Sequence, residues 1–375
     1  MRLERLGQHE VYSLAHSANS IGENRMDSAT TIKEPSPPEA VVIQMVMGAW
    51  VSKVISDVTR LNVPDVLKQH GSMSAAEMIA RHGVEARPEC LERALRACAS
   101  LGIFTESATG EFGPTKLSDA LTMDSPVSVK KLVESLAGSW WKVWTGLCDA
   151  IRTGEPQARN QLGMEWWDYL KANPKEMEDF GEAMKSNSLS SMKGVLEKCD
   201  FTNSKKVVDV GGGFGHLIIA LLEKYSGLRG TVLDVPELIP IAKKNIQVND
   251  PGISSRLEYI GGDMFKSVPP ADVYVMKHII HDWDDGRCIR LLRNCHQSMT
   301  GDGRVICVDA VLAPMGDTAG TPAKLLDCNM MVFISGKERT KVQWDELYQA
   351  AGFQIHTITS LRDNFGTSII EGVKK

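Results

Sequence analysis

Short apolar runs alternate with amphipathic stretches from about Phe201 to the end of the chain. Runs of about four to eight β-branched residues between polar turns are typical of buried strands. We expect strands at Lys206–Val210, Arg229–Leu233, Leu257–Gly261, Val273–Lys277, Val305–Val311, Gln354–Ser360 and Ser368–Gly372. The last two, joined by a polar turn around Asp363 and Asn364, are expected to form an antiparallel hairpin at the sheet edge. The pattern therefore predicts an α/β fold, with a mainly parallel sheet covered by helices on both faces.

Helical periodicity dominates the region before the sheet. It covers Val41–Leu61, Val63–Gln69, Ser74–His82 and Pro88–Leu101, and a turn at Thr109-Gly110 then separates two short extended segments. Helices followed by a small hairpin predict a winged helix, which commonly reads DNA with its third helix. Between Val51 and Ser125, however, acidic residues slightly outnumber basic ones, which disfavours a nucleic-acid partner. We favour a packing or dimerisation role for this region.

The regions that flank the winged helix differ from it in pattern. Residues 1–40 are polar, lack periodicity and end in Pro35-Ser36-Pro37-Pro38, which predicts a flexible extension. Residues 127–198 are helical and rich in tryptophan, with Trp140 and Trp144 on one helix face. That face suits either a core seam or an aromatic wall against a flat ligand. We therefore expect an extension (1–40), a helical winged-helix and lid domain (41–198) and a catalytic domain (199–375).

Composition restricts the class of protein. With 375 residues and 43% hydrophobic content, the chain can build full cores. Its eight cysteines never form a C-x-x-C pair, which favours reduced thiols, and a net charge of −5 implies neither a nucleic-acid nor an anionic membrane partner. We find no apolar run near the roughly 20 residues of a membrane span and no secretory segment. These features predict a soluble, cytoplasmic protein without a membrane partner.

A glycine cluster follows the first expected strand, in Val207-Val208-Asp209-Val210-Gly211-Gly212-Gly213-Phe214-Gly215-His216. Such a turn between strand and helix brings the backbone close to a nucleotide-like ligand. The third glycine of the dinucleotide fingerprint is replaced by His216, and the residues fit D-x-G-x-G-x-G instead. This favours S-adenosylmethionine over NAD, with Gly211 and Gly213 near the cofactor. The alternative is a turn that only packs helix against strand.

Carboxylates follow the next two strands. Asp234 lies about twenty residues past the glycine turn, where a carboxylate can accept both ribose hydroxyl hydrogens, or alternatively cap a helix starting at Pro236. Asp263 and Met264 follow the third strand, where they would meet the adenine amino group and ring. Lys277 ends the fourth strand and is expected to reach the cofactor crevice.

His281 is the candidate general base, because imidazole titrates near neutral pH and can take a proton from a phenol. Asp309 and Glu338 are acids that would orient the imidazole. Alternatively, Asp309 is a strand-end turn residue and Glu338 pairs with Lys337 or Arg339. His278 and His281 are three residues apart, but without further ligands at metal-site spacing we expect no metal, and a hydrogen-bonded structural role for His278.

Taken together, these motifs resemble the S-adenosylmethionine-dependent O-methyltransferases of the plant caffeate type and their bacterial and animal relatives. The strongest part of the likeness is His281-Asp282-Trp283 at its distance from the glycines, followed by Gly336-Lys337-Glu338-Arg339-Thr340. The resemblance covers about Val41 to the C-terminus. It implies a winged-helix dimerisation domain before a seven-stranded Rossmann-like methyltransferase domain.

The resemblance also implies site residues and shows two departures. Gly211, Asp234, Asp263, Met264 and Lys277 would bind the cofactor, and His281 would be the base. Plant members typically carry glutamate where this chain has Asp309, and the segment 327–340 has the bacterial rather than the plant spacing.

These expectations define a function. The chain would methylate a hydroxyl of a small aromatic metabolite, such as a phenol, catechol or aromatic polyketide, without a metal and as a homodimer formed through its N-terminal domain. Met184, Met330 and Trp283 are candidate acceptor contacts. One alternative is an enzyme of the same fold repurposed for hydroxylation or decarboxylation. The other is a winged-helix DNA-binding regulator that senses S-adenosylmethionine.

Overall fold

The structure is a computed structural model that describes residues 37–245, 248, 250–361, 363 and 365–375, with side chains except at residues 185–190. The expected extension, residues 1–40, lies almost entirely outside this part of the chain. The protein divides into two compact units, residues 1–138 and 139–375. By contacts, the helices between Ser139 and Lys198 therefore belong with the sheet, whereas the expected boundary was at residues 198 and 199.

The first unit has the predicted helices and hairpin. Its elements are α2 (Pro38–Arg60), α3 (Val63–His70), α4 (Ala75–His82), α5 (Pro88–Ser100), β1 (Phe104–Glu106), β2 (Phe112–Pro114), α6 (Lys116–Asp119) and α7 (Lys130–Ala137). Local chemistry sets the helix starts, since Ser74 and Glu77 form a reciprocal capping box on α4 and Pro88 occupies the first turn of α5. Apolar residues from α2 to β2, including Leu67, Met78, Leu95 and Phe112, form its core.

Helix α2 differs from the sequence-based expectation. Over 23 residues it contains a stretch of mean hydropathy 1.4 of which 11% is buried, so by length and composition alone it is apolar enough to cross a membrane. The expectation that no apolar run approaches that length is wrong for this helix. Its exposed side chains include Val46 and Trp50, at 70% and 72% exposure. An exposed apolar surface of this kind is typical of a site that binds a protein or a membrane.

The second unit begins with a helical layer that holds most of the tryptophans. It comprises α8 (Ser139–Trp144), α9 (Leu147–Thr153), α10 (Ala158–Leu162), α11 (Trp166–Ala172) and α12 (Pro174–Lys198). Trp140 and Trp166 pack edge to face against Phe333 of α17 (Thr321–Phe333). Phe180 packs on both tryptophans. Trp144 Nε1 donates a hydrogen bond to Asn329 Oδ1 of α17 at 2.7 Å. The tryptophan face is therefore largely a packed seam between this layer and α17.

The sheet follows the predicted strands closely. Its order is β5 (Leu257–Gly261), β4 (Arg229–Asp234), β3 (Lys206–Val210), β6 (Ala271–Lys277), β7 (Met299–Leu312), β10 (Thr367–Lys374) and β9 (Phe353–Ser360). The five strands from β5 to β7 are parallel to one another. The predicted final hairpin is present, but β10 lies between β7 and β9, antiparallel to both, so β9 forms the edge.

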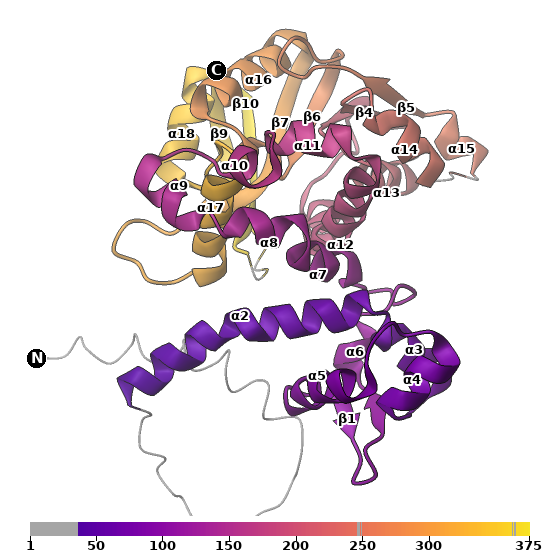
Figure 1. The fold of residues 1–375 in the computed structure, drawn as a ribbon. Coiled ribbons are helices and arrows are strands. Elements are labelled where there is room, and N and C mark those ends of the chain that lie inside the picture. Colours follow the sequence, from indigo (N-terminus) through magenta and orange to yellow (C-terminus); the bar gives the residue numbers. More distant parts are fainter. Residues whose placement is uncertain (1–36, 246–247, 249, 362, 364) are drawn as a thin grey trace, which may run out of the picture. The chain divides into compact units, whose positions relative to one another are not determined.

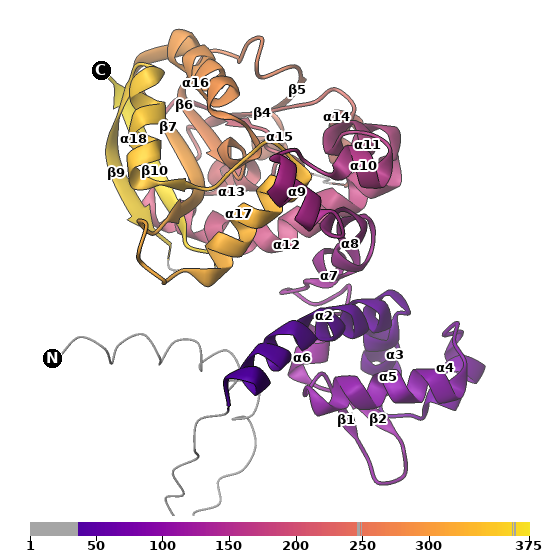
Figure 2. The same ribbon diagram turned by 60° about the vertical axis from the view of Figure 1, so that its left-hand side comes forward.

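Alternate residues of the central strands pack on opposite faces of the sheet. One face carries Val208, Tyr274 and Cys307 against α16 (Asp285–Ser298) and α18 (Lys341–Ala350). The other carries Val207, Val275 and Ile306 against α12 and α13 (His216–Lys224). The two groups of helices lie on either side of the sheet (Figure 1; Figure 2). This layering leaves the carboxyl ends of the parallel strands as the place for a ligand.

Candidate active site

The glycine turn joins β3 to α13 at the carboxyl edge of the sheet. Gly211, Gly213 and Gly215 have φ values of 69°, 58° and 88°, which residues with a Cβ rarely adopt. Gly215 is the N-cap of α13 and offers no side chain to the first turn. The backbone of this turn is therefore shaped for close approach by a ligand at a helix N-terminus.

Asp234, at the end of β4, is bound to the same turn. Its Oδ2 accepts a hydrogen bond from Gly213 N at 2.9 Å, and its Oδ1 accepts one from Val235 N at 2.7 Å. Burial raises the pKa of Asp234, and these two backbone donors oppose that rise. Helix α14 (Leu238–Asn245) begins four residues later, so the carboxylate is directed to the glycine turn.

Asp263 and Met264 follow β5, on the neighbouring strand. Asp263 Oδ1 accepts from Phe265 N at 2.9 Å, and its half-exposed carboxylate also pairs with Lys266. Met264 and Phe265 pack against the same core as Trp283, whose ring meets Phe265 edge to face. Trp283 also stacks on Trp167 of α11, with ring centroids 6.0 Å apart. An apolar wall thus stands beside the carboxylate of Asp263.

Lys277 ends β6 and is half-buried. Burial lowers its pKa, while the negative charges of Asp209 and then Asp309, both buried, oppose the shift. Lys277 thus interacts electrostatically with the buried acids of the site.

The chain turns sharply after Lys277. His278 has a left-handed backbone (φ 55°), and its N–H donates to Val308 O of β7 at 3.0 Å. The short 3-10 helix η1 (Ile280–Asp282) follows and carries His281. The turn therefore sets His281 beside the end of β7, where Asp309 lies.

His281 and Glu338 form the tightest contact of the site. His281 Nδ1 lies 2.7 Å from Glu338 Oε1, and 3.7 Å from Asp309 Oδ1. Asp282 Oδ1 is 3.5 Å from the other ring nitrogen, Nε2. Glu338 thus engages the imidazole directly, whereas Asp309 acts on it by charge alone.

Burial lowers the pKa of His281, but the surrounding carboxylates, first Glu338 and then Asp309 and Asp282, more than offset it and raise that pKa to about 10. Burial also raises the pKa of Asp309 above its usual range, and the positive charge of His281 opposes this. By contrast, burial and the nearby Lys277 hold the pKa of His278 well below its ordinary value. The pKa values of the two histidines are therefore shifted in opposite directions: the carboxylates favour the protonated form of His281, whereas burial and Lys277 favour the neutral form of His278.

A very short strand brings Glu338 to His281. β8 (Arg339–Thr340) pairs in parallel with Val311 and Leu312, just past Asp309. Glu338 N donates to Asp327 Oδ1 of α17 at 2.8 Å, which fixes the backbone before the strand. Lys337 and Arg339 both pair with Asp285, so they are partners of that residue and not of Glu338.

Three further residues support the site and were not assigned a role from the sequence. The buried guanidinium of Arg339 donates to the carbonyls of Ile280 and Trp283, on either side of His281. Gly336 approaches so closely that a Cβ would lie 1.9 Å from the His281 carbonyl oxygen. Asp327 anchors Glu338. Arg339 and Gly336 lie in the conspicuous run Gly336–Thr340, which could have pointed to them. Nothing in the sequence pointed to Asp327.

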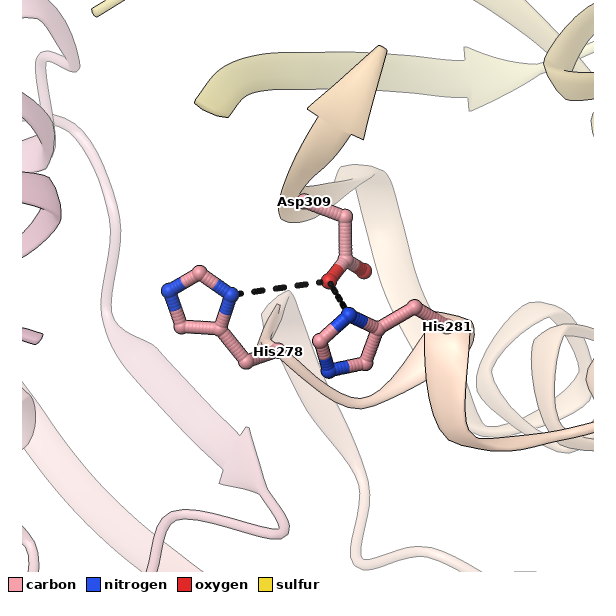
Figure 3. A group of neighbouring side chains, drawn as sticks. All are labelled: His278, His281 and Asp309. Atoms are coloured by element: carbon pink, nitrogen blue, oxygen red, sulfur yellow. Dashed lines mark ion pairs between the residues drawn. The ribbon is translucent and has the colours of Figure 1, made fainter. Parts of the chain in front are cut away.

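His278, His281 and Asp309 also meet as a group. The ligand atoms that they offer lie within 4.8 Å of one another, and both imidazoles face Asp309 (Figure 3). His278 Nδ1 is 3.8 Å from Asp309 Oδ1, and its Nε2 is 3.5 Å from Ser191 Oγ.

The acceptor candidates are dispersed. Met330 is buried in the aromatic seam of α8, α11 and α17, Met184 is half-buried on α12, and Trp283 belongs to the wall beside Met264. The structure thus separates Met330 from Trp283 into different apolar clusters of the unit.

Comparison with known proteins agrees with this geometry. Residues 144–354 match the model of the O-methyltransferase domain, which includes every site residue from Gly211 to Glu338. The chain belongs to the O-methyltransferase family. Residues 43–124 match the O-methyltransferase dimerisation domain, which places α2 to β2 in that domain. The family is the class II, S-adenosylmethionine-dependent type, so the protein is an O-methyltransferase.

Relatives from several organisms match over most of their length. A phenazine O-methyltransferase of Lysobacter antibioticus is 31% identical, covering 89% of this chain and 96% of the relative. A mitomycin biosynthesis 6-O-methyltransferase of Streptomyces lavendulae is also 31% identical, over 84% and 89%. The structure of human N-acetylserotonin methyltransferase in complex with S-adenosylmethionine superposes with a TM-score of 0.83 at 26% identity, covering 91% and 99% of the two chains. The O-methyltransferase fold thus extends over both units.

Proposed function

We propose that this O-methyltransferase transfers a methyl group to a hydroxyl of a small, planar aromatic metabolite, with His281 as the general base. The observation that carries the proposal is the 2.7 Å contact between His281 Nδ1 and Glu338 Oε1 in a buried site. It leaves Nε2 as the nitrogen that can accept a proton. Relatives named for phenazine, mitomycin and pluviatolide substrates support an aromatic acceptor.

The residues at the carboxyl edge of the sheet fit S-adenosylmethionine. The glycine turn with its unobstructed N-cap suits the polar end of the cofactor, Asp234 its ribose, and Asp263 and Met264 its adenine. When bound, the cofactor supplies an electrophilic sulfonium methyl group. The fold then has to align the acceptor oxygen with that methyl group and exclude water.

In the proposed reaction, His281 Nε2 takes the hydroxyl proton as the acceptor oxygen bonds to the methyl carbon and the carbon–sulfur bond breaks. Glu338 holds the ring by its Nδ1, and both Glu338 and Asp309 stabilise the imidazolium that forms. Because the pKa of His281 is about 10, it is close to that of a simple phenol. Matched pKa values favour proton transfer between the two groups.

The remaining features of the proposal concern the acceptor and the assembly. Met184, Met330 and Trp283 are proposed to limit the acceptor pocket, since thioethers and rings adapt to flat apolar molecules. We also propose that two chains pair through the dimerisation domain, that the enzyme is cytoplasmic, and that methyl transfer requires no metal.

The test incubates the purified protein with methyl-labelled S-adenosylmethionine and a panel of phenols, catechols and aromatic polyketides. We expect a mass gain of one methyl group on at least one weakly acidic hydroxyl. His281→Asn should lower that rate by about 100- to 10,000-fold, because general base catalysis is lost. The affinity for the cofactor, measured by calorimetry, should change little.

The acidity of the acceptor provides an internal control. An acceptor that is already ionised at the assay pH needs no base, so His281→Asn should retain much more of its rate on such a molecule. Full activity of the variant on a weakly acidic phenol would exclude His281 as the base. A product that is hydroxylated or decarboxylated rather than methylated would favour the repurposed-enzyme alternative.

A further inference from the structure

We propose that His278, Asp309 and His281 form a binding site for a divalent transition-metal ion, exemplified by Zn²⁺, whose occupation inhibits the enzyme. The inference rests on the proposed role of His281 and adds a ligand to the same site. The metal is an inhibitor in this proposal and takes no part in methyl transfer.

The geometry is close to that of a metal site. The three ligand atoms lie within 4.8 Å of one another, with Asp309 Oδ1 at 3.8 Å from His278 Nδ1 and 3.7 Å from His281 Nδ1 (Figure 3). Zinc bonds of roughly 2.0 to 2.2 Å in a tetrahedral arrangement separate neighbouring ligand atoms by about 3.3 Å. Each imidazole therefore has to move about half an ångström nearer to Asp309, and the two imidazoles, which lie within 4.8 Å of one another, have to approach each other to share one ion.

Buried carboxylate oxygens that accept no hydrogen bond supply the second, independent observation. Asp309 is completely buried, and neither of its oxygens has a hydrogen-bond partner among the described residues; the same holds for Glu338 Oε2. Buried acceptors without donors are costly, and a cation offsets that cost. Glu338 Oε1 already lies against His281 Nδ1, so this carboxylate is the natural fourth ligand once the ion takes the place of the Nδ1 proton.

Charge in the site also admits a dication. Asp309, Glu338 and Asp282 surround the imidazoles, and Lys277 is the fixed positive charge that acts on His278 and Asp309. Three acidic side chains thus face one lysine, so a dication would enter a site of opposite formal charge. An ion bound to His281 Nδ1 would hold the imidazole in place and break its direct contact with Glu338, so the histidine could no longer act as the base.

The experiment titrates the purified enzyme with Co²⁺ in the absence of acceptor, and follows visible absorption of a low-symmetry, nitrogen–oxygen-ligated ion. In parallel, Zn²⁺ is titrated into the methyl-transfer assay and reversed with a chelator. We expect a cobalt spectrum with one ion per chain and reversible inhibition by zinc. The absorption needs no turnover, so it tests the metal site even if the proposed acceptor class is wrong.

His278→Asn is the diagnostic variant. Asparagine tolerates the left-handed backbone at this position and removes the imidazole ligand. Removing a residue that hydrogen-bonds to a metal ligand typically weakens metal affinity by about 10- to 100-fold. Removing the ligand itself should weaken metal affinity at least tenfold. Zinc inhibition of this variant is expressed relative to its own rate without added metal, so a change in that basal rate does not affect the comparison.

His82→Asn is the matched control. His70 and His82 stack on the surface of the first unit with ring centroids 4.0 Å apart, and they are a second place where a metal could bind. This variant should keep the sensitivity of the wild-type enzyme to zinc. Three results would overturn the proposal. The first is a His278→Asn enzyme as sensitive to zinc as the wild type, and the second is a loss of zinc sensitivity in His82→Asn instead. The third is a cobalt spectrum dominated by thiolate ligation.

Discussion

Glu338 determines the protonation of His281 more than any other residue in the site. Glu338→Gln keeps a hydrogen-bond acceptor near Nδ1 but removes the anion, so the pKa of His281 should fall. Because the neutral imidazole is the base, the rising limb of kcat/KM should move to lower pH, by about one to three units. The maximum rate should also fall, since the imidazolium formed during the reaction loses its stabilising charge. The measurement is the pH profile on a weakly acidic phenol.

Asp309→Asn provides the comparison. Asp309 is 3.7 Å from the same nitrogen and makes no hydrogen bond to it, so its replacement should move the profile less. Profiles that coincide for wild type and Glu338→Gln would show that Glu338 does not control the base. At this scale the sequence identified His281, Glu338 and Asp309 as candidates. The resemblance favoured Glu338 over Asp309, where plant members carry glutamate, but the distances of the two acids from His281 are set by strand pairing and could not be predicted.

Arg339 illustrates what a sequence does not reveal about a residue. Arg339 is completely buried and donates to the Ile280 and Trp283 carbonyls, whereas from the chain alone it was only a possible partner of Glu338. Arg339→Met removes the charged donors of both carbonyls and leaves them only the weaker contacts with Trp283 N and the Cys288 thiol, which should cost about 1 to 3 kcal/mol of unfolding free energy. Thermal or urea denaturation should detect the loss. Lys337→Met, at an exposed partner of the same Asp285, should cost much less.

The loop between α17 and β8 is the element that closes the site against η1. Gly336 allows the closest contact, since a Cβ there would lie 1.9 Å from His281 O and 2.6 Å from the Asp282 carbonyl carbon. Gly336→Ala must therefore displace one of the two backbones. A shift of about 1 Å in a catalytic group can cost 100-fold in rate, so kcat should fall by at least about tenfold. Initial rates at saturating cofactor would measure it.

Gly227→Ala is the control for that variant, because nothing lies within 4 Å of a Cβ built at Gly227 and its backbone is not left-handed. Normal kcat and melting temperature in Gly336→Ala would contradict the close contact.

The long elements were predictable because β-branched runs and helical periodicity span many residues. β8, with two residues, has no periodicity, and yet it sets Glu338 beside Asp309.

Across the whole molecule, the sequence predicted a helical region and a sheet region, but not the boundary between the two compact units. The helices from Ser139 to Lys198 read as part of the winged-helix region, because their pattern is helical. They belong to the sheet unit, because Trp140 and Trp166 pack on Phe333 of α17. Their aromatic partners lie more than 150 residues away in the chain, and such pairings leave no local signal.

Helix α2 carries the last prediction, which concerns assembly. Val42, Ile43, Met45, Val46 and Trp50 are each more than half exposed in the single chain, and a hollow of about 350 Å³ is lined by Trp50 and Val54. A continuous group of exposed apolar side chains such as this one is seldom solvent-exposed in the functional assembly. We expect a second copy to cover it, so that the wild-type protein sediments at twice its chain mass of 41.2 kDa. Trp50→Glu should shift the equilibrium toward the monomer.

Val342→Glu, at an exposed apolar position on α18, is the control and should remain a dimer. Analytical ultracentrifugation at several concentrations distinguishes the two variants, because burying a charge in the α2 interface weakens association whereas a charge in water does not. The apolarity of α2 also allows a test against lipid. If wild-type protein is monomeric in buffer but floats with neutral liposomes, and Trp50→Glu does not float, then the surface binds a bilayer and the proposed homodimer is wrong.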